Sequence, residues 1–301
     1  MYLERFNIYL SEEERKNFIE YDHEFFQVQY LDEKYNRSKG GNSCVFNLHD
    51  PNLEEDFAIK FCKFSLSNKA KFRLPILRFE REIEALYKAK DGNFENVIDI
   101  KFDGSHKVNG LEFRYYVMEK ADMDLTEFIK TNEDLTLANK ILLFGDIVKG
   151  VNELHSLDIY HRDIKPDNVF FVGNKWKVGD LGLIGKRNDE ISKEELRKKI
   201  GPYGWLSPEV MNKVIWEGTN RAQNYDCILN EKSDAFQLGK LFWFILQGNV
   251  PLGQITKTDF IPDDERLFEI IFDLTQYSKS RRPELVAVDQ KISDLHHDYG
   301  L

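Results

Sequence analysis

The pattern of apolar and polar residues changes near residue 120. Before that point, apolar residues are mostly β-branched or aromatic and often alternate with polar ones, as in strands. From about residue 124 onward, apolar residues recur every three or four positions, as in amphipathic helices. The pattern predicts an α+β protein with a smaller β-rich lobe over 26–120 and a larger, mainly helical lobe over 121–301.

The first lobe is predicted to hold five strands and one helix. Segments with strand composition lie near 26–32, 43–48, 56–64, 97–107 and 112–118. The helix is expected over 78–90, where apolar side chains share one face; these are Phe79, Ile83, Leu86 and Tyr87. Before this lobe, Ser11 and the three glutamates after it resemble a capping box. We therefore expect a helix over 12–22, within an N-terminal helical extension over 1–25.

The second lobe is predicted to contain long helices, of which the clearest cover 137–156 and 233–247. Short strands are expected at 169–172 and 175–178, on either side of a turn. The polar stretch over 214–232 fits either a partner site or a plain loop, and the sequence leaves that choice open.

Composition narrows the class of protein. Over 301 residues, 42% are hydrophobic and 13% aromatic, which is ordinary for a globular chain. The formal charge of −10 argues against nonspecific nucleic-acid binding, which needs dense Lys and Arg.

The three cysteines show no metal-binding spacing, which favours a reducing compartment. The first residues lack a signal-peptide pattern, and the longest apolar run, 241–246, is too short to cross a bilayer. We expect a soluble, cytoplasmic protein without membrane association.

The most informative stretch is His-Arg-Asp-Ile-Lys-Pro-Asp-Asn, which covers 161–168. It places an acid, a cation and an amide at fixed offsets in one loop. Phosphoryl transfer needs such groups, because a carboxylate orients the hydroxyl, a cation stabilises the moving phosphoryl group, and an oxygen ligand holds the metal. This run resembles the catalytic loop of eukaryotic-type protein kinases.

The resemblance continues in Asp180-Leu181-Gly182, which is similar to the metal-binding Asp-Phe-Gly motif of kinases with Leu in place of Phe. It implies that ATP and Mg²⁺, with Mn²⁺ as an alternative, are the cofactors and that Asn168 and Asp180 are the metal ligands.

The resemblance also implies roles within the loop itself. Asp163 would receive the proton of the substrate hydroxyl, and Lys165 would steady the γ-phosphoryl group. Arg162 would receive an anion from the activation segment. His161 is expected to pack against Leu181 rather than act as a base.

Phe-Ala-Ile-Lys at 57–60 resembles the strand that carries the nucleotide-binding lysine. Strand alternation places Ala58 and Lys60 on one face, where Ala58 leaves room for adenine and Lys60 reaches the phosphates. The anionic partner of Lys60 is expected to be Glu82, in Arg-Glu-Ile, while Glu80 and Glu84 are alternatives that point elsewhere on the helix.

The glycine-rich loop is the weakest match. Aligned on Val45, the three glycine positions of the family pattern hold Ser38, Gly40 and Ser43, and Gly41 lies one position off. Close approach of the backbone to phosphates remains possible, but the loop is expected to be stiffer or differently shaped. Cys44 lies within this predicted phosphate loop.

The resemblance assigns the remaining nucleotide contacts to the end of the last strand and the large lobe. Met118 would be the gatekeeper, and backbone groups of Glu119 and Ala121 would bind the adenine edge. Asp124 would reach the ribose, and Phe170 would form the floor under adenine.

Two further motifs extend the resemblance from about residue 28 to 290. Ser-Pro-Glu at 207–209 resembles Ala-Pro-Glu, whose Glu pairs with a buried Arg; Arg282 is the expected partner of Glu209. Asp234 resembles the helix Asp that braces the catalytic-loop backbone, and so its role would be structural.

Two departures leave questions open. Before Ser-Pro-Glu, Ser/Thr kinases usually carry Gly-Thr, but this chain has Gly201-Pro202, and proline has no hydroxyl or N–H. Ser192 fits two interpretations, as a phosphorylation site that pairs with Arg162 or as the N-cap of a helix.

The leading hypothesis is an active protein kinase that phosphorylates Ser or Thr of a protein substrate, as Lys165 in the catalytic loop favours. A kinase-fold scaffold with little catalysis is the alternative, motivated by the glycine loop and Pro202. A small-molecule kinase ranks last, because Ser-Pro-Glu and its Arg partner are present. The oligomeric state stays open.

Overall fold

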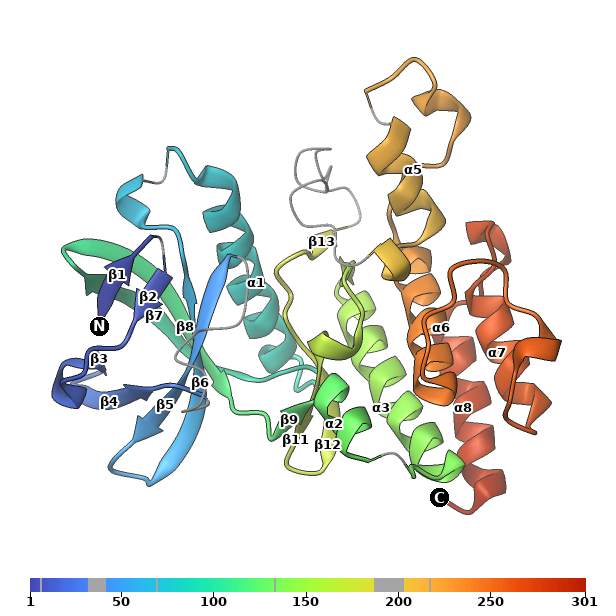
Figure 1. The fold of residues 1–301 in the computed structure, drawn as a ribbon, viewed down its shortest axis with the longest axis horizontal. Coiled ribbons are helices and arrows are strands. Elements are labelled where there is room, and N and C mark those ends of the chain that lie inside the picture. Colours follow the sequence, from blue (N-terminus) through green and yellow to red (C-terminus); the bar gives the residue numbers. More distant parts are fainter. Residues whose placement is uncertain (6, 32–41, 69, 133, 187–202, 217) are drawn as a thin grey trace. The chain divides into compact units, whose positions relative to one another are not determined.

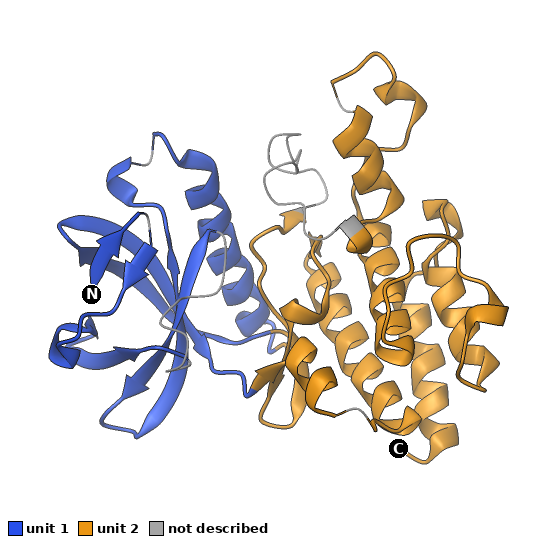
Figure 2. Cartoon of the chain, in the orientation of Figure 1, with its two compact units in different colours: residues 1–93, 98–122 blue, residues 94–97, 123–301 orange. Residues whose placement is uncertain are grey.

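The computed structural model describes residues 1–5, 7–31, 42–68, 70–132, 134–186, 203–216 and 218–301. The chain forms two compact units (Figures 1 and 2). Unit 1 comprises Met1–Asn93 and Ile98–Asp122, and unit 2 comprises Phe94–Val97 and Met123–Leu301. Unit 1 is rich in strands and unit 2 is mainly helical, so the predicted α+β class is confirmed.

Unit 1 is built on a six-stranded antiparallel sheet with the order β3-β4-β5-β6-β8-β7. Five of these strands match the predicted segments, and β3 is an addition at one edge. The strands are β3 (Phe18–Tyr21), β4 (Glu24–Gln29), β5 (Ser43–Asp50), β6 (Glu55–Cys62), β7 (Ile100–Val108) and β8 (Leu111–Glu119).

One face of the sheet packs against helix α1 (Arg73–Asp91), which is longer than the predicted helix at its N-terminal end. Its buried side chains recur at helical spacing and include Ile76, Phe79, Ile83 and Leu86. The Phe79 ring lies 5.3 Å from the ring of Tyr116 on β8, which anchors the helix to this face.

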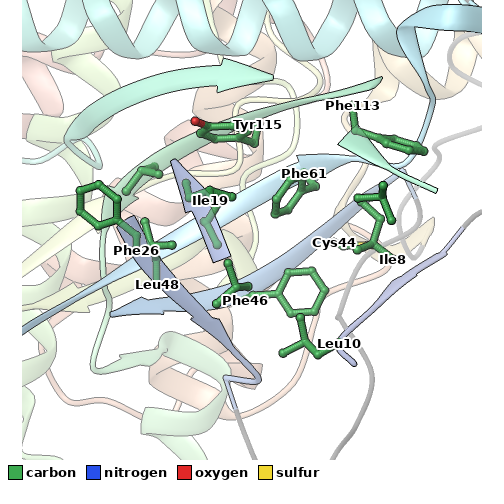
Figure 3. Packing of buried hydrophobic residues seen from close by; sticks show 14 residues of the cluster. Ile8, Leu10, Ile19, Phe26, Cys44, Phe46, Leu48, Phe61, Phe113 and Tyr115 are labelled. Atoms are coloured by element: carbon green, nitrogen blue, oxygen red, sulfur yellow. The ribbon is translucent and has the colours of Figure 1, made fainter. Parts of the chain in front are cut away.

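The opposite face of the sheet carries the aromatic core of unit 1 (Figure 3). Alternation along β5, β6 and β8 directs apolar side chains to this face, and the N-terminal segment covers them. The labelled members of the core are Ile8, Leu10, Ile19, Phe26, Cys44, Phe46, Leu48, Phe61, Phe113 and Tyr115.

The predicted helix over 12–22, and with it the helical extension over 1–25, is wrong. This region forms strands β1 (Tyr2–Glu4), β2 (Asn7–Tyr9) and β3, with only a short 3₁₀ turn, η1 (Glu14–Lys16). The Ser11 hydroxyl accepts from the N–H of Glu13, and the Asn17 side chain bonds the backbone of Ser11, so these side chains close a turn. Burial of Ile19 in the aromatic core then outweighs the local capping signal.

Unit 2 is organised around α3 (Leu137–Ser156), which contacts α6 (Glu231–Gln247) and α8 (Leu285–Tyr299). The predicted helices over 137–156 and 233–247 are therefore confirmed. The other helices described are α2 (Leu125–Thr131), α5 (Pro208–Trp216) and α7 (Glu265–Leu274). No helix in the described part of the chain combines the length and apolar composition needed to cross a bilayer.

Short strands of unit 2 hold the loops that carry the motifs. β12 (Lys175–Val178), β11 (Val169–Val172) and β9 (Met123–Asp124) form one antiparallel sheet, and β10 (Ile159–Tyr160) pairs with β13 (Gly185–Lys186). The predicted strands at 169–172 and 175–178 are confirmed. The segment 161–168 therefore runs from β10 to β11, and 179–184 runs from β12 to β13.

Candidate active site

In unit 1, Lys60 and Glu82 form a buried ion pair. Lys60 Nζ lies 2.8 Å from Glu82 Oε1, and the two side chains are 7% and 2% exposed. The ammonium group is also 5.7 Å from the centroid of the Tyr116 ring, a favourable position for a cation. Glu82 is the partner that the sequence predicted, whereas Glu84 is exposed.

The strand register gathers the expected nucleotide contacts of unit 1 on one face of the sheet. Val45 is opposite Lys60, and Ala58 is opposite Met118. Directly paired residues share a face, and so do residues two apart on a strand. Ser43, Val45, Ala58, Lys60 and Met118 therefore lie on the face that packs against α1. Ser38, Gly40 and Gly41 lie outside the described residues.

The cysteines of this region are structural. Cys44 is fully buried in the aromatic core, on the face opposite Lys60. Cys62 is also buried, and burial raises the pKa of its thiol to about 11. Because the thiolate is the reactive form, Cys62 does not suit nucleophilic chemistry, and Cys44 is excluded by its complete burial. Neither these two cysteines nor Cys227 forms a disulfide among the described residues.

The segment after β8 is fixed by contacts that the sequence did not reveal. The N–H of Glu119 donates to the carbonyl of Asp99 at 3.0 Å, so this N–H is engaged within the protein. Lys120 Nζ lies 2.9 Å from Asp56 Oδ2, and His49 Nδ1 lies 2.9 Å from Asp56 Oδ1. The hydrogen bond from Lys120 is the main reason that the pKa of Asp56 falls to about 2.

In unit 2, Asp124 and Phe170 are paired neighbours on β9 and β11. Both are half-buried. Asp124 is also the N-cap of α2, because its Oδ1 accepts from the N–H of Glu127 at 2.9 Å. Its carboxylate therefore stabilises a helix, a role that the sequence analysis did not assign.

The catalytic-loop motif forms a compact polar cluster around Asp163. Lys165 Nζ donates to Asp163 Oδ2 at 2.8 Å, and Asn168 Nδ2 donates to the same oxygen at 3.0 Å. Asn168 Nδ2 also donates to the carbonyl of Asp163 at 2.7 Å. Within the described part of the chain, Asp163 Oδ1 accepts no hydrogen bond. The cluster thus fixes one carboxylate oxygen and leaves the other for a ligand.

His161 is fully buried and acts as a structural link. Its Nδ1 accepts from the N–H of Asp163 at 3.3 Å, so the proton resides on Nε2, which lies 3.1 Å from the carbonyl of Gly179. Both ring nitrogens are engaged, which agrees with the prediction that His161 is not a base.

Helix α6 holds the backbone of the catalytic loop. Asp234 Oδ2 accepts from the N–H of His161 at 2.7 Å, and Oδ1 accepts from the N–H of Arg162 at 2.8 Å. Burial raises the pKa of Asp234, but hydrogen bonds and charges led by His155 outweigh it, so the pKa lies below its ordinary value. The predicted bracing role of Asp234 is confirmed.

Gln237 adds a second brace that the sequence analysis missed. Its Oε1 accepts from the N–H of Ile164 at 3.1 Å, and its Nε2 donates to the carbonyl of Arg162 at 3.2 Å. Gln237 lies three residues after Asp234 and therefore on the same face of α6. This spacing of three residues from Asp234 could have identified Gln237 from the sequence.

Asp180 follows β12 and is placed near Asn168 by the backbone, because the N–H of Gly179 donates to the carbonyl of Asn168 at 3.0 Å. Asp180 has a φ of 52°, and Arg162 has a φ of 67°, in the left-handed region that non-glycine residues rarely adopt. Such backbone strain concentrates at functional sites.

Asn168 and Asp180 fit a magnesium site. The Asn168 amide nitrogen is held by Asp163, which turns its oxygen the other way, and Asp180 adds a carboxylate. No cluster of three or more His, Cys, Asp or Glu side chains that could hold a metal occurs among the described residues. A site with two protein oxygens suits Mg²⁺, which commonly binds one or two carboxylates, waters and phosphates.

Arg282 and Glu209 form a second buried ion pair, as the sequence predicted. Two parallel hydrogen bonds of 2.8 and 3.0 Å join the guanidinium and carboxylate groups. This pair ties the start of α5 to the loop before α8. The predicted positions Ser192, Gly201 and Pro202 lie outside the described residues.

Comparison with known proteins adds independent findings. A model of the protein kinase domain matches residues 38–298. The chain is 28% identical over 246 residues to the serine/threonine-protein kinase PknB of Mycobacterium leprae, which covers 78% of this chain and 36% of that protein. It is 28% identical over 215 residues to the serine/threonine-protein kinase PrkC of Bacillus subtilis, covering 70% and 29%. The chain thus spans about a third of the length of these relatives.

Proposed function

Because this chain belongs to the protein kinase domain family, we propose that it transfers the γ-phosphoryl group of ATP, with Mg²⁺, to Ser or Thr hydroxyl groups of a protein substrate. The two relatives carry names of serine/threonine-protein kinases, which supports the choice of acceptor. The observation that carries the proposal is the cluster in which Asp163 Oδ2 holds Lys165 and Asn168.

The cluster suits a reaction in which a hydroxyl oxygen attacks phosphorus. Asp163 Oδ1 accepts the hydrogen bond of the substrate hydroxyl and takes its proton as the new P–O bond forms. The bond between the γ-phosphorus and the β–γ bridging oxygen breaks in the same transfer, and ADP leaves with that oxygen. Lys165 is held by the same carboxylate, 2.8 Å away, and supplies positive charge to the transferring group. One side chain therefore orients both the nucleophile and the cation.

The roles proposed for the nucleotide-binding and metal-binding residues follow from their positions in the fold. Lys60, oriented by Glu82, binds the α- and β-phosphates, and Val45, Ala58 and Met118 line the adenine site on the same sheet face. Asn168 and Asp180 hold Mg²⁺, which neutralises charge on the phosphate oxygens when bound.

The adenine and ribose are bound by the segment after β8 and by β9 and β11. A backbone group of Ala121 and the carbonyl of Glu119 bind the adenine edge. The N–H of Glu119 takes no part, because Asp99 accepts it. Phe170 contacts the adenine, and Asp124, the N-cap of α2, binds the ribose.

The test is incubation of the chain with labelled ATP, Mg²⁺ and a panel of protein substrates. Asp163→Asn is expected to lower phosphoryl transfer by about 10²- to 10⁴-fold, the usual contribution of a positioned acid or base. Asp167→Asn, an exposed acid in the same loop, is the matched control and should stay within a few-fold of wild type. Mass spectrometry of the product identifies the acceptor residue.

The alternative is a kinase-fold scaffold that binds nucleotide without transfer. It would show ATP binding that depends on Lys60 but a wild-type transfer rate no higher than that of Asp163→Asn. That result would overturn the proposal. Transfer to Tyr alone would overturn the choice of acceptor but leave the kinase activity standing.

A further inference from the structure

Lys240 is a buried cation to which the proposed reaction assigns no role. It lies on α6, it is only 6% exposed, and burial lowers the pKa of its ammonium group. Its Nζ donates to the backbone carbonyl of Gly204, in the 3₁₀ turn η4 (Tyr203–Trp205) that precedes α5. The ammonium group therefore holds a position of the backbone.

Lys240 continues a row of polar side chains on α6. Asp234, Gln237 and Lys240 follow one another at intervals of three residues, so each is a neighbour of the next on the helix surface. The first two bind the backbone of the catalytic loop, and Lys240 binds the segment before α5. Lys240 thus supplies an anchor that Pro202, which has neither a hydroxyl nor an N–H, cannot supply.

The segment from Gly204 to Glu209 is held by a cation at each end. Arg282 bonds the Glu209 carboxylate, and Lys240 bonds the Gly204 carbonyl. Both cations also lie near the ring of Phe236. The Arg282 guanidinium carbon is 4.8 Å from the ring centroid, and Lys240 Nζ is 5.5 Å from it. The backbone between these two anchors therefore has little freedom.

Lys240 places this segment close to the catalytic loop. Gln237 Oε1 accepts from the N–H of Ile164, the residue after Asp163, at 3.1 Å. Side chains three residues apart on a helix have Cβ atoms about 5–6 Å apart. Because Gln237 binds the catalytic loop and Lys240 binds Gly204, the two segments lie side by side within unit 2.

The surface beside Gly204 is accessible to a protein substrate. Gly204 itself is half-buried. A Cβ atom added there would lie 3.6 Å from Leu252 Cδ2, and Leu252 is exposed. A substrate whose hydroxyl reaches Asp163 therefore passes over this surface, and its fit depends on where the Gly204 backbone lies.

The fold itself does not need a cation at Lys240. Moving an ammonium group out of water costs free energy, and one carbonyl group and one aromatic ring offset that cost only in part. An unbranched apolar residue of similar length would pack against Phe236 without the cost. A buried charge that weakens the fold while it orients a neighbouring segment points to a role in the site.

We propose that Lys240 is a positioning residue for the protein substrate. By fixing the backbone at Gly204 beside the catalytic loop, it aligns the surface that delivers the acceptor hydroxyl to Asp163. The inference rests on the proposed kinase function and deepens it, because it concerns how the acceptor, and not the nucleotide, is held.

The first test is Lys240→Met in the full chain, with the panel protein that the wild type phosphorylates fastest as the acceptor. We expect kcat/KM for this acceptor to fall at least tenfold. KM for ATP, and the hydrolysis of ATP without an acceptor, should stay within twofold. Lys149→Met, at an exposed position on α3, is the matched control and should keep the wild-type rates.

A conservative variant and urea unfolding separate positioning from a merely structural role. Lys240→Arg keeps a cationic donor for the Gly204 carbonyl and should stay within threefold of wild type in kcat/KM. The urea midpoint of Lys240→Met should be no lower than that of wild type. A lower midpoint with equal losses of transfer and ATP hydrolysis would overturn the proposal, and so would a wild-type kcat/KM.

Fluorine NMR of fluorotryptophan-labelled protein needs no activity. Trp205 is the last residue of η4 and is buried, and Trp205→Phe assigns its signal. This signal should shift or broaden in Lys240→Met but not in Lys149→Met, and an unchanged signal would overturn the inference. If wild type transfers no faster than Asp163→Asn, the proposed function fails, while a changed signal still shows that Lys240 orders this segment.

Discussion

The Arg282–Glu209 pair of unit 2 and the Lys60–Glu82 pair of unit 1 are both almost inaccessible to solvent, yet they are built differently. Arg282 uses all five N–H donors. Two go to Glu209, and three go to carbonyl groups in the backbone of Lys232, Gln276 and Tyr277. The guanidinium also lies 4.8 Å from the Phe236 ring centroid. No donor remains for a ligand, which marks this pair as structural.

Lys60 differs because an ammonium group is a compact charge on a flexible stem, with three donors that can change acceptors. Its bond to Glu82 holds the charge in place without a fixed fork geometry. The comparison teaches that burial and opposite charge alone do not decide the role of an ion pair. All five donors of Arg282 are committed to the protein, whereas the role proposed for Lys60 needs an ammonium group that can change acceptors.

The largest expected effect is on stability, from Arg282→Met. The change leaves the Glu209 carboxylate and three carbonyl groups buried without their donor, and loss of one partner of a buried pair costs about 3–5 kcal/mol. Urea unfolding measures it. Arg281→Met, at the exposed neighbouring position, is the control and should cost less than about 0.5 kcal/mol. If Arg282→Met lowers the free energy of unfolding by less than about 1 kcal/mol, the Arg282–Glu209 pair does not have the structural role given to it here.

The next effect is on activity, from Lys60→Met. We expect kcat/KM for phosphoryl transfer to fall about 10²- to 10³-fold, the usual cost of one positioned electrostatic group. Stability should fall less than in Arg282→Met, because Arg282→Met also leaves three buried backbone carbonyl groups without their donor. Lys107→Met, on the exposed side of β7, is the matched control. Equal stability losses in the two variants would show that the pairs are not different in kind.

A smaller effect is expected from Asp234→Asn, which tests a buried carboxylate that accepts chiefly from backbone N–H groups. Asparagine keeps one acceptor but turns an NH₂ group toward a donor, so one buried group goes unsatisfied at a cost of about 1–3 kcal/mol. The transfer rate should fall with it, because one of the N–H groups of His161 and Arg162 loses its acceptor. Asp294→Asn on α8 serves as the exposed control, and a matching loss there would refute this reading.

The smallest effect concerns the partly exposed Lys120–Asp56 pair. Lys120→Met should raise the pKa of Asp56 from about 2 toward its ordinary value, because the main hydrogen bond that lowers it is lost. A lowered folded-state pKa stabilises the protein above the unfolded pKa, and that stabilisation disappears as pH falls through about 2. The loss at pH 7 should stay below about 1 kcal/mol, as for exposed pairs.

Carboxyl-carbon NMR titration of Asp56 measures this shift directly. Glu54→Gln is the matched control, because Glu54 lies 3.9 Å from His49 but makes no hydrogen bond to Lys120. An unchanged Asp56 pKa in Lys120→Met would assign the shift to His49 instead.

The sequence predicted the two-part organisation and the partners of both buried ion pairs. It could do so because these features follow from strand and helix periods and from motifs of fixed spacing. Glu82 was distinguished from Glu80 by its motif, and the observed bond to Lys60 agrees.

Other features could not be read from local sequence. The segment over 12–22 carries a helix-capping signal. However, Ile19 is buried in a core that is assembled from distant strands. This tertiary contact favours a strand over the helix that the local sequence predicts. The guanidinium group of Arg162 lies against Gly185, which is 23 residues away in the sequence. Such effects arise from packing between segments and have no local pattern.

The aromatic core of unit 1 determines how far this protein can be truncated from its N-terminal end. The family match begins at residue 38, so a fragment that starts there looks complete by alignment. It would lack β1 to β4 and, with them, Ile8, Ile19 and Phe26, leaving Phe46 and Phe61 bare to water. A large exposed apolar patch beside an unpaired strand edge promotes aggregation. Recombinant versions that keep the first residues should therefore stay monodisperse where the shorter fragment precipitates.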